Sequence, residues 1–95
     1  MSKPLTYDSR NKPTVAVALH YAGRGAPRLT AKGHGAVAEQ ILKVAREHGV
    51  PLDEDAALAQ TLAQLDLGQE IPRELYLAVA QVLAFAWQLK NKSPL

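Results

Sequence analysis

The chain of 95 residues contains no cysteine, one tryptophan, one phenylalanine and no long apolar run. The absence of cysteine excludes disulfides and cysteine-ligated zinc sites, and it is typical of a reducing intracellular location. No apolar run approaches the roughly 20 residues that a membrane-spanning helix needs. The first residues also lack the apolar centre of a signal peptide. We therefore expect a soluble, cytoplasmic protein that reaches a membrane only through a partner.

The residues that are present indicate one globular domain, because 47% of them are apolar. The charge is uneven: residues 1–32 have a net charge of +5 and residues 33–95 a net charge of −3. The basic residues of the first part are Lys3, Arg10, Lys12, Arg24, Arg28 and Lys32. Such a basic part could meet nucleic acid, lipid headgroups or an acidic protein. We expect solvated surface charge instead, because these residues are scattered and few aromatics lie among them.

The first third of the chain predicts a tail and two strands. Residues 1–12 are polar and aperiodic, so we expect a flexible N-terminal tail. Residues 15–19, extended by His20 and Tyr21, predict a strand that is covered on both faces. The glycines and proline of residues 22–27 predict a turn, and residues 28–31 a second strand that ends before Gly33 and Gly35. A short edge strand is expected at residues 50–52, because Pro51 favours an edge.

Three later segments have the spacing of amphipathic helices: residues 35–48, the stretch from Asp53 to Gly68, and residues 72–90. Asp53 or Asp55 should cap the second helix, and Pro72 should begin the third. The predicted core faces are Val37, Ile41, Val44, Ala45 and His48; then Leu58, Leu62 and Leu65; then Leu75, Tyr76, Val79, Val82, Leu83, Ala86 and Trp87. Residues 91–95 are expected to be a frayed tail. The whole predicts a single α+β (α/β) domain, a small mixed sheet of about four short strands surrounded by three to four helices.

Few residues point to catalysis. The glycines of residues 32–35 precede a helix, but they match no phosphate-binding motif and favour a plain strand-to-helix turn. His20, His34 and His48 are too far apart for a helical metal site. Helix capping accounts for residues 53–55 better than a metal or acid–base cluster does. We therefore expect no metal, no cofactor and no enzymatic activity, and a binding module is the default interpretation.

Residues 68–89, GQEIPRELYLAVAQVLAFAWQL, resemble the C-terminal domain of the FlhB family of flagellar and type III secretion proteins. The family pattern is Gly-Gln-x-Ile-Pro, then Leu-Tyr-x-Ala-Val-Ala-x-Val-Leu-Ala. Other blocks agree in order, namely VAVALHY at 15–21, AP at 26–27, AKG at 31–33, AREHGVPL at 45–52, and Leu58, Ala59 and Leu62. The resemblance spans residues 11–89, and it implies a family domain over residues 13–90 with a small sheet wrapped by helices. In the family this domain follows a membrane region, so we expect either a free-standing paralogue or a piece of a longer protein.

Family members carry Asn-Pro-Thr-His before the first strand of the domain, and the Asn amide attacks its own carbonyl to break the chain. The cleavage resets export from rod and hook substrates to filament substrates. An ungapped alignment places Asn11 at the cleavage position, followed by Lys12, with Thr14 in place of His. Alignment on Pro13 and Thr14 places Lys12 there instead, and lysine cannot cyclise. We expect a degenerate loop that does not cleave itself, although a self-processing protein that still breaks at Asn11 is a rival.

The resemblance also implies an apolar patch that receives export substrates. By motif it falls on Ala26 and Pro27, and on Ala80 and Leu83. It is an equally good interpretation that Leu83 belongs only to the hydrophobic core. The function implied is a non-enzymatic part of the flagellar export apparatus at the inner membrane, whose partners are gate proteins and rod- and hook-type substrates. The alternatives are the same role in a virulence-type secretion system, or a nucleic-acid binder, which would lose affinity steeply with salt.

Overall fold

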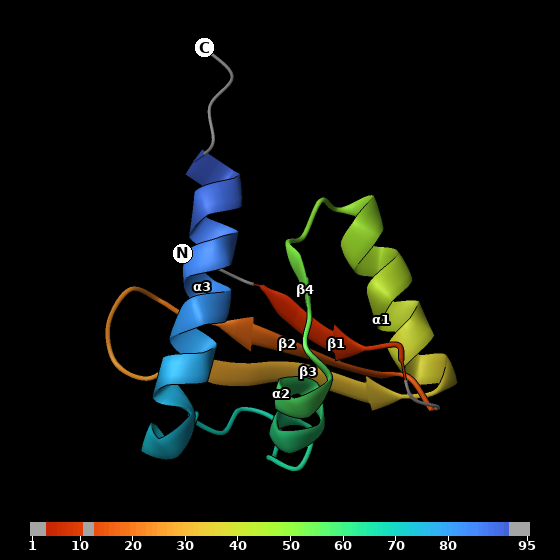
Figure 1. Ribbon diagram of the computed structural model, residues 1–95, viewed down its shortest axis with the longest axis horizontal. Coiled ribbons are helices and arrows are strands. Elements are labelled where there is room, and N and C mark those ends of the chain that lie inside the picture. The colour runs from red at the N-terminus through yellow and green to blue at the C-terminus, as the bar shows by residue number, and fades with distance from the viewer. Residues whose placement is uncertain (1–3, 11–12, 92–95) are drawn as a thin grey trace.

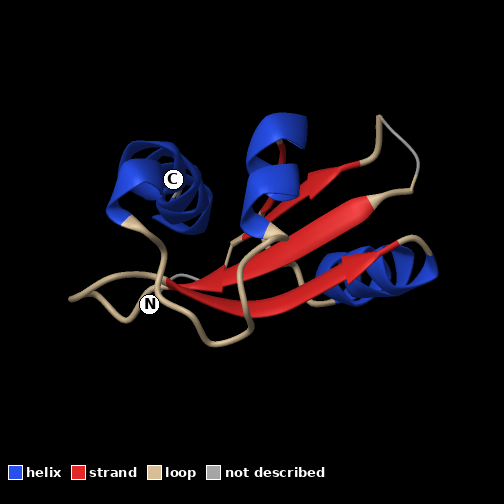
Figure 2. Cartoon of the chain, turned by 90° about the horizontal axis from the view of Figure 1, so that it is seen from below, coloured by secondary structure: helices blue, strands red, loops and turns tan. Residues whose placement is uncertain are grey.

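The computed structural model describes residues 4–10 and 13–91, with side chains as far as residue 84. The elements in chain order are β1 (Leu5–Asp8), β2 (Val15–His20), β3 (Arg28–His34), α1 (Ala36–Glu47), β4 (Leu52–Glu54), α2 (Ala56–Leu62), the 3-10 turn η1 (Arg73–Leu75) and α3 (Tyr76–Asn91). The strands form one sheet in the order β3-β2-β1-β4. Helix α1 covers one face, and α2 and α3 cover the other (Figures 1 and 2). The predicted α+β architecture is confirmed.

The central strand β2 is buried on both faces, as its continuous apolar run predicts. Val15, Val17 and Leu19 belong to the core beneath α2 and α3. Ala16 belongs to the second core, beneath α1. β2 pairs antiparallel with both β1 and β3, so it fixes the positions of all three strands.

Residues 1–12 are not simply a flexible tail, and this prediction is wrong for the described residues 4–10. Residues Leu5–Asp8 form β1, which lies between β2 and β4. The Leu19 N–H also donates to the carbonyl of Pro4, 2.9 Å away. The strand escaped prediction because Thr6 and Asp8, which a tail would expose, are fully buried. At the other end, Asn91 belongs to α3 and not to a tail, and residues 92–95 lie outside the described residues.

Helix α1 occupies its predicted place but turns a different face to the sheet. Its buried residues are Ala38, Leu42 and Ala45. Val37 and Val44, which we placed in the core, are 57% and 43% exposed. Ala45 is buried as predicted and Ile41 packs partly against the core, whereas the core assignments of Val37, Val44 and His48 are wrong. The helix is rotated so that Ala38 and Leu42 face the sheet, and the small Ala38 lets it approach closely.

The close approach of α1 depends on Gly33 in β3, where we had predicted that the strand would already have ended. A Cβ atom at Gly33 would lie 2.5 Å from Cγ1 of Val37 and 3.1 Å from the backbone N of Ala38. We expect Gly33→Ala to lower the free energy of unfolding by about 1–3 kcal/mol, as overpacking does. Urea denaturation measures the change. Adding Val37→Ala should recover part of the loss, and a Gly33→Ala protein as stable as the parent would contradict this packing.

The ends of the remaining elements follow local rules. Asp55 caps α2 by accepting the Leu58 N–H at 3.1 Å, so the predicted cap is confirmed. β4 is an edge strand, as Pro51 indicated, but it begins at Leu52. α2 ends at Leu62 and does not reach Gly68.

The chain enters α3 through η1, which follows Pro72. In α3, Val79 and Val82 are buried as predicted, and Leu75 and Leu83 pack partly against the same core. Tyr76 is 43% exposed, so its assignment to the core is wrong. The side chains of Ala86 and Trp87 lie outside those described.

Candidate functional site

The loop just before β2, residues 11–14, is the one that aligns with the cleavage loop of the family. Asn11 and Lys12 lie outside the described residues, whereas Pro13 is exposed and Thr14 is 2% exposed. The Thr14 hydroxyl donates to Oε2 of Glu39 at 2.7 Å, and the Thr14 carbonyl accepts the Gly35 N–H at 2.8 Å. Thr14 is thus fixed to the first turn of α1, and its hydroxyl acts as an anchor.

The opposite end of this loop is held by Asp8, which pairs with Val15 across the sheet. Asp8 is fully buried, and its Oδ1 accepts the Arg10 N–H at 2.9 Å. Its Oδ2 accepts from Nε2 of Gln60 on α2 at 3.0 Å. The loop is therefore closed by buried polar contacts at both ends. Sequence analysis missed this role because residues 1–12, which include Asp8, were predicted to be a flexible tail.

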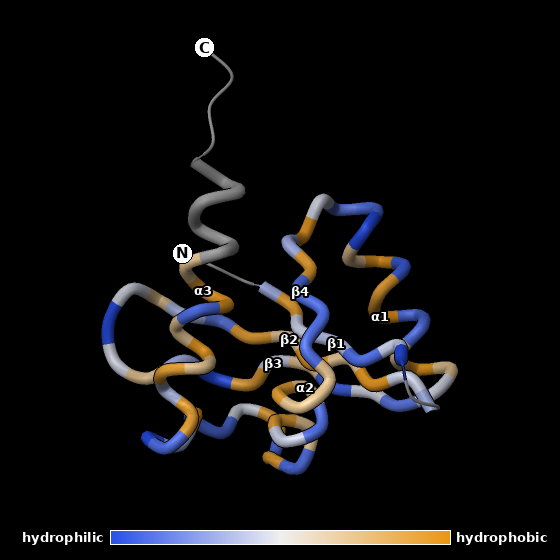
Figure 3. The backbone as a smooth tube through the Cα atoms, viewed as in Figure 1, coloured by the Kyte–Doolittle hydropathy of each residue, from blue (hydrophilic) through white to orange (hydrophobic). Residues whose placement is uncertain are grey.

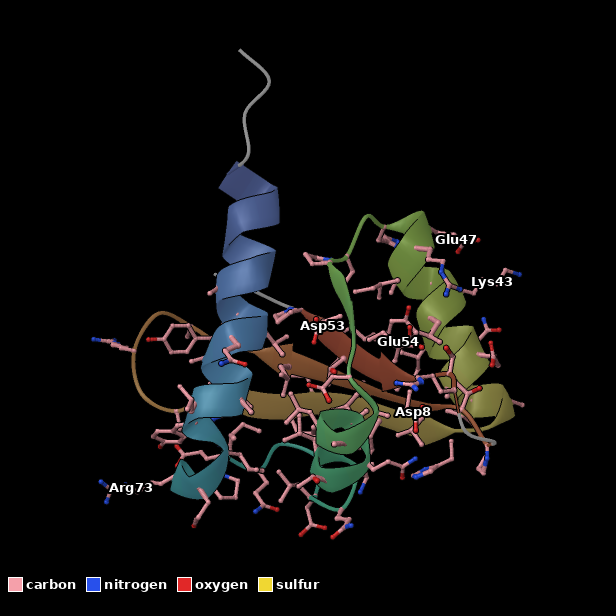
Figure 4. All side chains as sticks on the ribbon, in the orientation of Figure 1. Asp8, Lys43, Glu47, Asp53, Glu54 and Arg73 are labelled. Carbon is pink, nitrogen blue, oxygen red and sulfur yellow. The ribbon has the colours of Figure 1, made fainter. Side chains whose placement is uncertain are left out.

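The carboxylates of residues 53–55 have separate structural roles. Asp55 caps α2, and Glu54 accepts from the Ser9 hydroxyl at 2.6 Å. Asp53 and Glu54 come from β4, next to the strand that carries Asp8 (Figure 4). Among the described residues, no group of three histidine, aspartate or glutamate side chains is placed to hold a metal ion. The glycine-rich segment is a strand-to-helix turn, in which Gly35 adopts a φ of +58°.

Asp53 provides a pH prediction. Burial, and then the nearby charge of Asp55, raise the pKa of Asp53 above its ordinary value of 3.8. Because the pKa of Asp53 is higher in the folded state than in the unfolded state, protonation of Asp53 favours folding. Its contribution to the free energy of unfolding is therefore complete below about pH 3.8 and is lost as the pH rises through the folded-state pKa. We expect Asp53→Asn to raise the melting temperature at neutral pH and to leave it nearly unchanged near pH 3. Asp66→Asn, at an exposed carboxylate, is the control, and a lower melting temperature for Asp53→Asn at neutral pH would contradict the assignment.

The residues of the predicted apolar patch come from the loop that joins β2 to β3 and from α3, which crosses the end of the sheet (Figures 1 and 2). Pro27 is buried, and its carbonyl accepts the Ile71 N–H at 2.9 Å just before α3 begins. Ala26 is half-buried and Ala80 is exposed. Leu83 is partly buried and packs against the core, and its part in a binding surface stays a prediction.

Two exposed apolar residues adjoin the predicted patch on α3, and sequence analysis missed them. Leu77 is 75% exposed, and Tyr76 is 43% exposed. They precede Ala80 by three and four residues, which places them beside it on the helix surface. Apolar residues follow one another along the first half of α3 (Figure 3). The available signal was that α3 is apolar around most of its circumference, which is typical of a helix that has a partner on its outer face.

Two basic residues of the N-terminal third are used inside the domain. Arg28 donates to Oε2 of Glu70 and to the Gly68 carbonyl, both at 2.9 Å. The Lys32 ammonium donates to the carbonyls of Ala63 at 3.2 Å and Leu65 at 2.6 Å, just beyond the end of α2. These contacts give Arg28 and Lys32 structural roles in holding the segment after α2 against β3.

The four-stranded mixed sheet with helices on both faces is the fold that this chain shares with the cytoplasmic domains of type III export proteins. The family model described as the FlhB HrpN YscU SpaS family matches residues 10–86, and the chain belongs to this family. Within the described part of the chain, no helix combines the length and apolar character needed to cross a membrane.

The chain is similar to several relatives. It is 46% identical over 85 residues to the flagellar biosynthetic protein FlhB of Escherichia coli, a match that covers 85% of this chain and 22% of that protein. It is 42% identical over 83 residues to YlqH of Bacillus subtilis, covering 81% of this chain and 89% of YlqH. The crystal structure of the FlhB cytoplasmic domain from Shewanella putrefaciens superposes with a TM-score of 0.84 at 35% identity, over 96% of this chain and 74% of that one. The chain thus spans about a fifth of the FlhB proteins that it matches.

Proposed function

We propose that this protein is a non-enzymatic, cytoplasmic component of the flagellar export apparatus, peripheral at the inner membrane. It binds gate proteins and rod- or hook-type substrates, and it stands in for the cytoplasmic switch domain of FlhB without cleaving itself. The observation that carries this proposal is the family match over residues 10–86 in a chain without Asn-Pro at the loop before β2.

The proposed lack of cleavage follows from the chemistry of the loop. Cyclisation at Asn11 would have to break the bond to Lys12, because Pro13 comes one residue too late. The residue aligned with the family His is Thr14, whose hydroxyl is held by Glu39. In this alignment Lys12 replaces the family proline, and Thr14, which is hydrogen-bonded to Glu39, replaces the family His.

The proposed binding role rests on the exposed part of the patch. Ala26, Tyr76, Leu77 and Ala80 leave apolar surface open beside the partly covered Leu83. A small apolar surface of this kind suits a transient contact with a short peptide segment.

Co-purification tests the proposal. The bait is a membrane FlhB that lacks its own C-terminal domain, and this chain is supplied separately. We expect the truncated bait to retain the chain and full-length FlhB to retain less of it. In full-length FlhB, its own C-terminal domain already occupies the position at which this chain would bind. If neither bait retained the chain, the stand-in role would be overturned, and the family membership would be unaffected.

A further inference from the structure

Of the strands that the structure describes, β1 alone precedes the loop that aligns with the family's cleavage position. It lies inside the sheet, antiparallel to β2 on one side and parallel to β4 on the other (Figure 1). The FlhB domain of Shewanella putrefaciens superposes over 96% of this chain, a share that residues 9–95 alone do not reach, so the match extends into β1. A FlhB truncated at this loop therefore keeps the equivalent of β1 and loses the strands that surround it.

Backbone hydrogen bonds fix β1 in the sheet. The Leu5 N–H donates to the carbonyl of Pro51 at 3.0 Å, and the carbonyl of Tyr7 accepts the Asp55 N–H at 2.9 Å. Every residue except proline carries the same backbone donor and acceptor, so these bonds do not select a side chain. Another extended segment in the same register can therefore make them in place of β1.

The face of β1 that points into the larger core is polar. Thr6 and Asp8 lie opposite Val17 and Val15, which belong to the core beneath α2 and α3, and both are fully buried. The Thr6 hydroxyl has no hydrogen-bond partner among the described residues, and an unsatisfied buried hydroxyl destabilises a fold. The Asp8 carboxylate is hydrogen-bonded, but moving a carboxylate from water into a core is still costly. A strand with apolar side chains at these two positions fits this core better than β1 does.

We propose that β1 is exchangeable, and that the FlhB strand preceding the cleavage loop replaces it when this chain meets a FlhB that has lost its C-terminal domain. The incoming strand is extended and is apolar at the two positions that Thr6 and Asp8 occupy here. It pairs with β2 and β4 in the register of β1, and β1 leaves the sheet. This inference rests on the proposed function and names the segment of FlhB that holds the chain.

The polar face of β1 also distinguishes between possible occupants. A second copy of this chain offers the same Thr6 and Asp8, so exchange between two copies replaces β1 with an identical strand and gains nothing. The chain's own β1 is covalently attached, which gives it an effective concentration of roughly millimolar or more. Only a strand that suits the core better overcomes this advantage, and removing one unpartnered buried hydroxyl changes such an equilibrium about tenfold.

A synthetic peptide tests the exchange without FlhB. The probe is a blocked peptide of residues 4–10 with Thr6→Val and Asp8→Val, and the control peptide has the parent sequence. With the full chain and millimolar probe, the amides of residues 5–8 should lose their protection from hydrogen exchange, whereas those of β2 and β4 should keep it. The control peptide should bind at least tenfold more weakly. Binding that leaves residues 5–8 protected, equal binding of the two peptides, or no binding at millimolar probe would each overturn the proposal.

Thr6→Val in the chain itself is the matched variant. It removes the buried hydroxyl and keeps the shape of the side chain, so the chain's own β1 fits better. The affinity for the probe peptide should fall about tenfold, and the melting temperature should rise. Thr30→Val is the control, because Thr30 is exposed on β3 and its hydroxyl donates to the carbonyl of Ala18. It should leave the affinity unchanged, and an equal effect of the two variants would contradict the role of Thr6.

Two FlhB baits separate this inference from the proposed function. One bait ends at its cleavage loop and keeps the strand before it, and the other is shortened further so that this strand is removed. The first bait should retain the chain at least tenfold better than the second. Equal retention by both baits would overturn the strand exchange and leave the stand-in role intact, whereas retention by neither would overturn both.

Discussion

The triple variant Lys12→Pro, Pro13→Thr, Thr14→His is expected to cleave itself, whereas the parent chain stays whole. The substitutions restore Asn-Pro-Thr-His beginning at Asn11, at the spacing before β2 that the family resemblance implies. The products would be a short peptide that ends at Asn11 and a larger fragment. Intact-mass spectrometry after long incubation at neutral pH measures this, and the parent should give one species of 10.3 kDa.

The control for this experiment is the same triple variant with Asn11→Ala, which removes the attacking amide and should remain whole. Thr14→His alone is a second control, because it removes the hydroxyl that donates to Glu39 without restoring proline. It should weaken the anchor of β2 and leave the chain uncleaved. Cleavage of the parent at Asn11, or a triple variant that stays whole, would contradict the account of the degenerate loop.

Ala80→Asp is expected to reduce association with the export gate or its substrates roughly tenfold or more, because it places a charge in an apolar contact. Ala80 is exposed, so the free energy of unfolding should fall by no more than about 1 kcal/mol. The measurement is retention on the truncated FlhB bait together with a urea titration. Leu83 is a poorer choice, since it packs against the core and its substitution would mix binding with stability.

Gln40→Asp is the control, since Gln40 is an exposed residue of α1, which covers the other face of the sheet. It introduces the same charge on another helix, and retention should be unaffected. Equal effects of the two variants would mean that added negative charge matters and that the apolar patch does not.

Much of the fold could be predicted because its signals are local. The apolar run of β2 indicated burial on both faces, Asp55 stood where a helix cap is expected, and Pro72 preceded the turn into α3. The resemblance placed the FlhB-like domain over most of the chain, and the family model matches residues 10–86. These features depend on neighbouring residues or on ordered sequence blocks, and both can be read without coordinates.

The features that escaped prediction depend on tertiary contacts. β1 carries the buried Asp8, whose carboxylate is satisfied by Gln60 from a distant helix, and no local pattern reveals such a partner. The buried face of α1 was misassigned because Ala38 faces the sheet while the larger Val37 stays exposed. Periodicity gives the spacing of a face, but the choice between two apolar faces depended on the close approach at Gly33.

The most direct test of the central claim is flagellar export in cells whose FlhB lacks its own C-terminal domain. This chain is supplied as a separate protein, and hook-type and filament-type substrates are measured in the culture medium. The account predicts that export of hook-type substrates returns with the parent chain, and that it does not return with Ala80→Asp at an equal cellular level. Absence of export with the parent chain, although it is present and folded, would contradict the stand-in role.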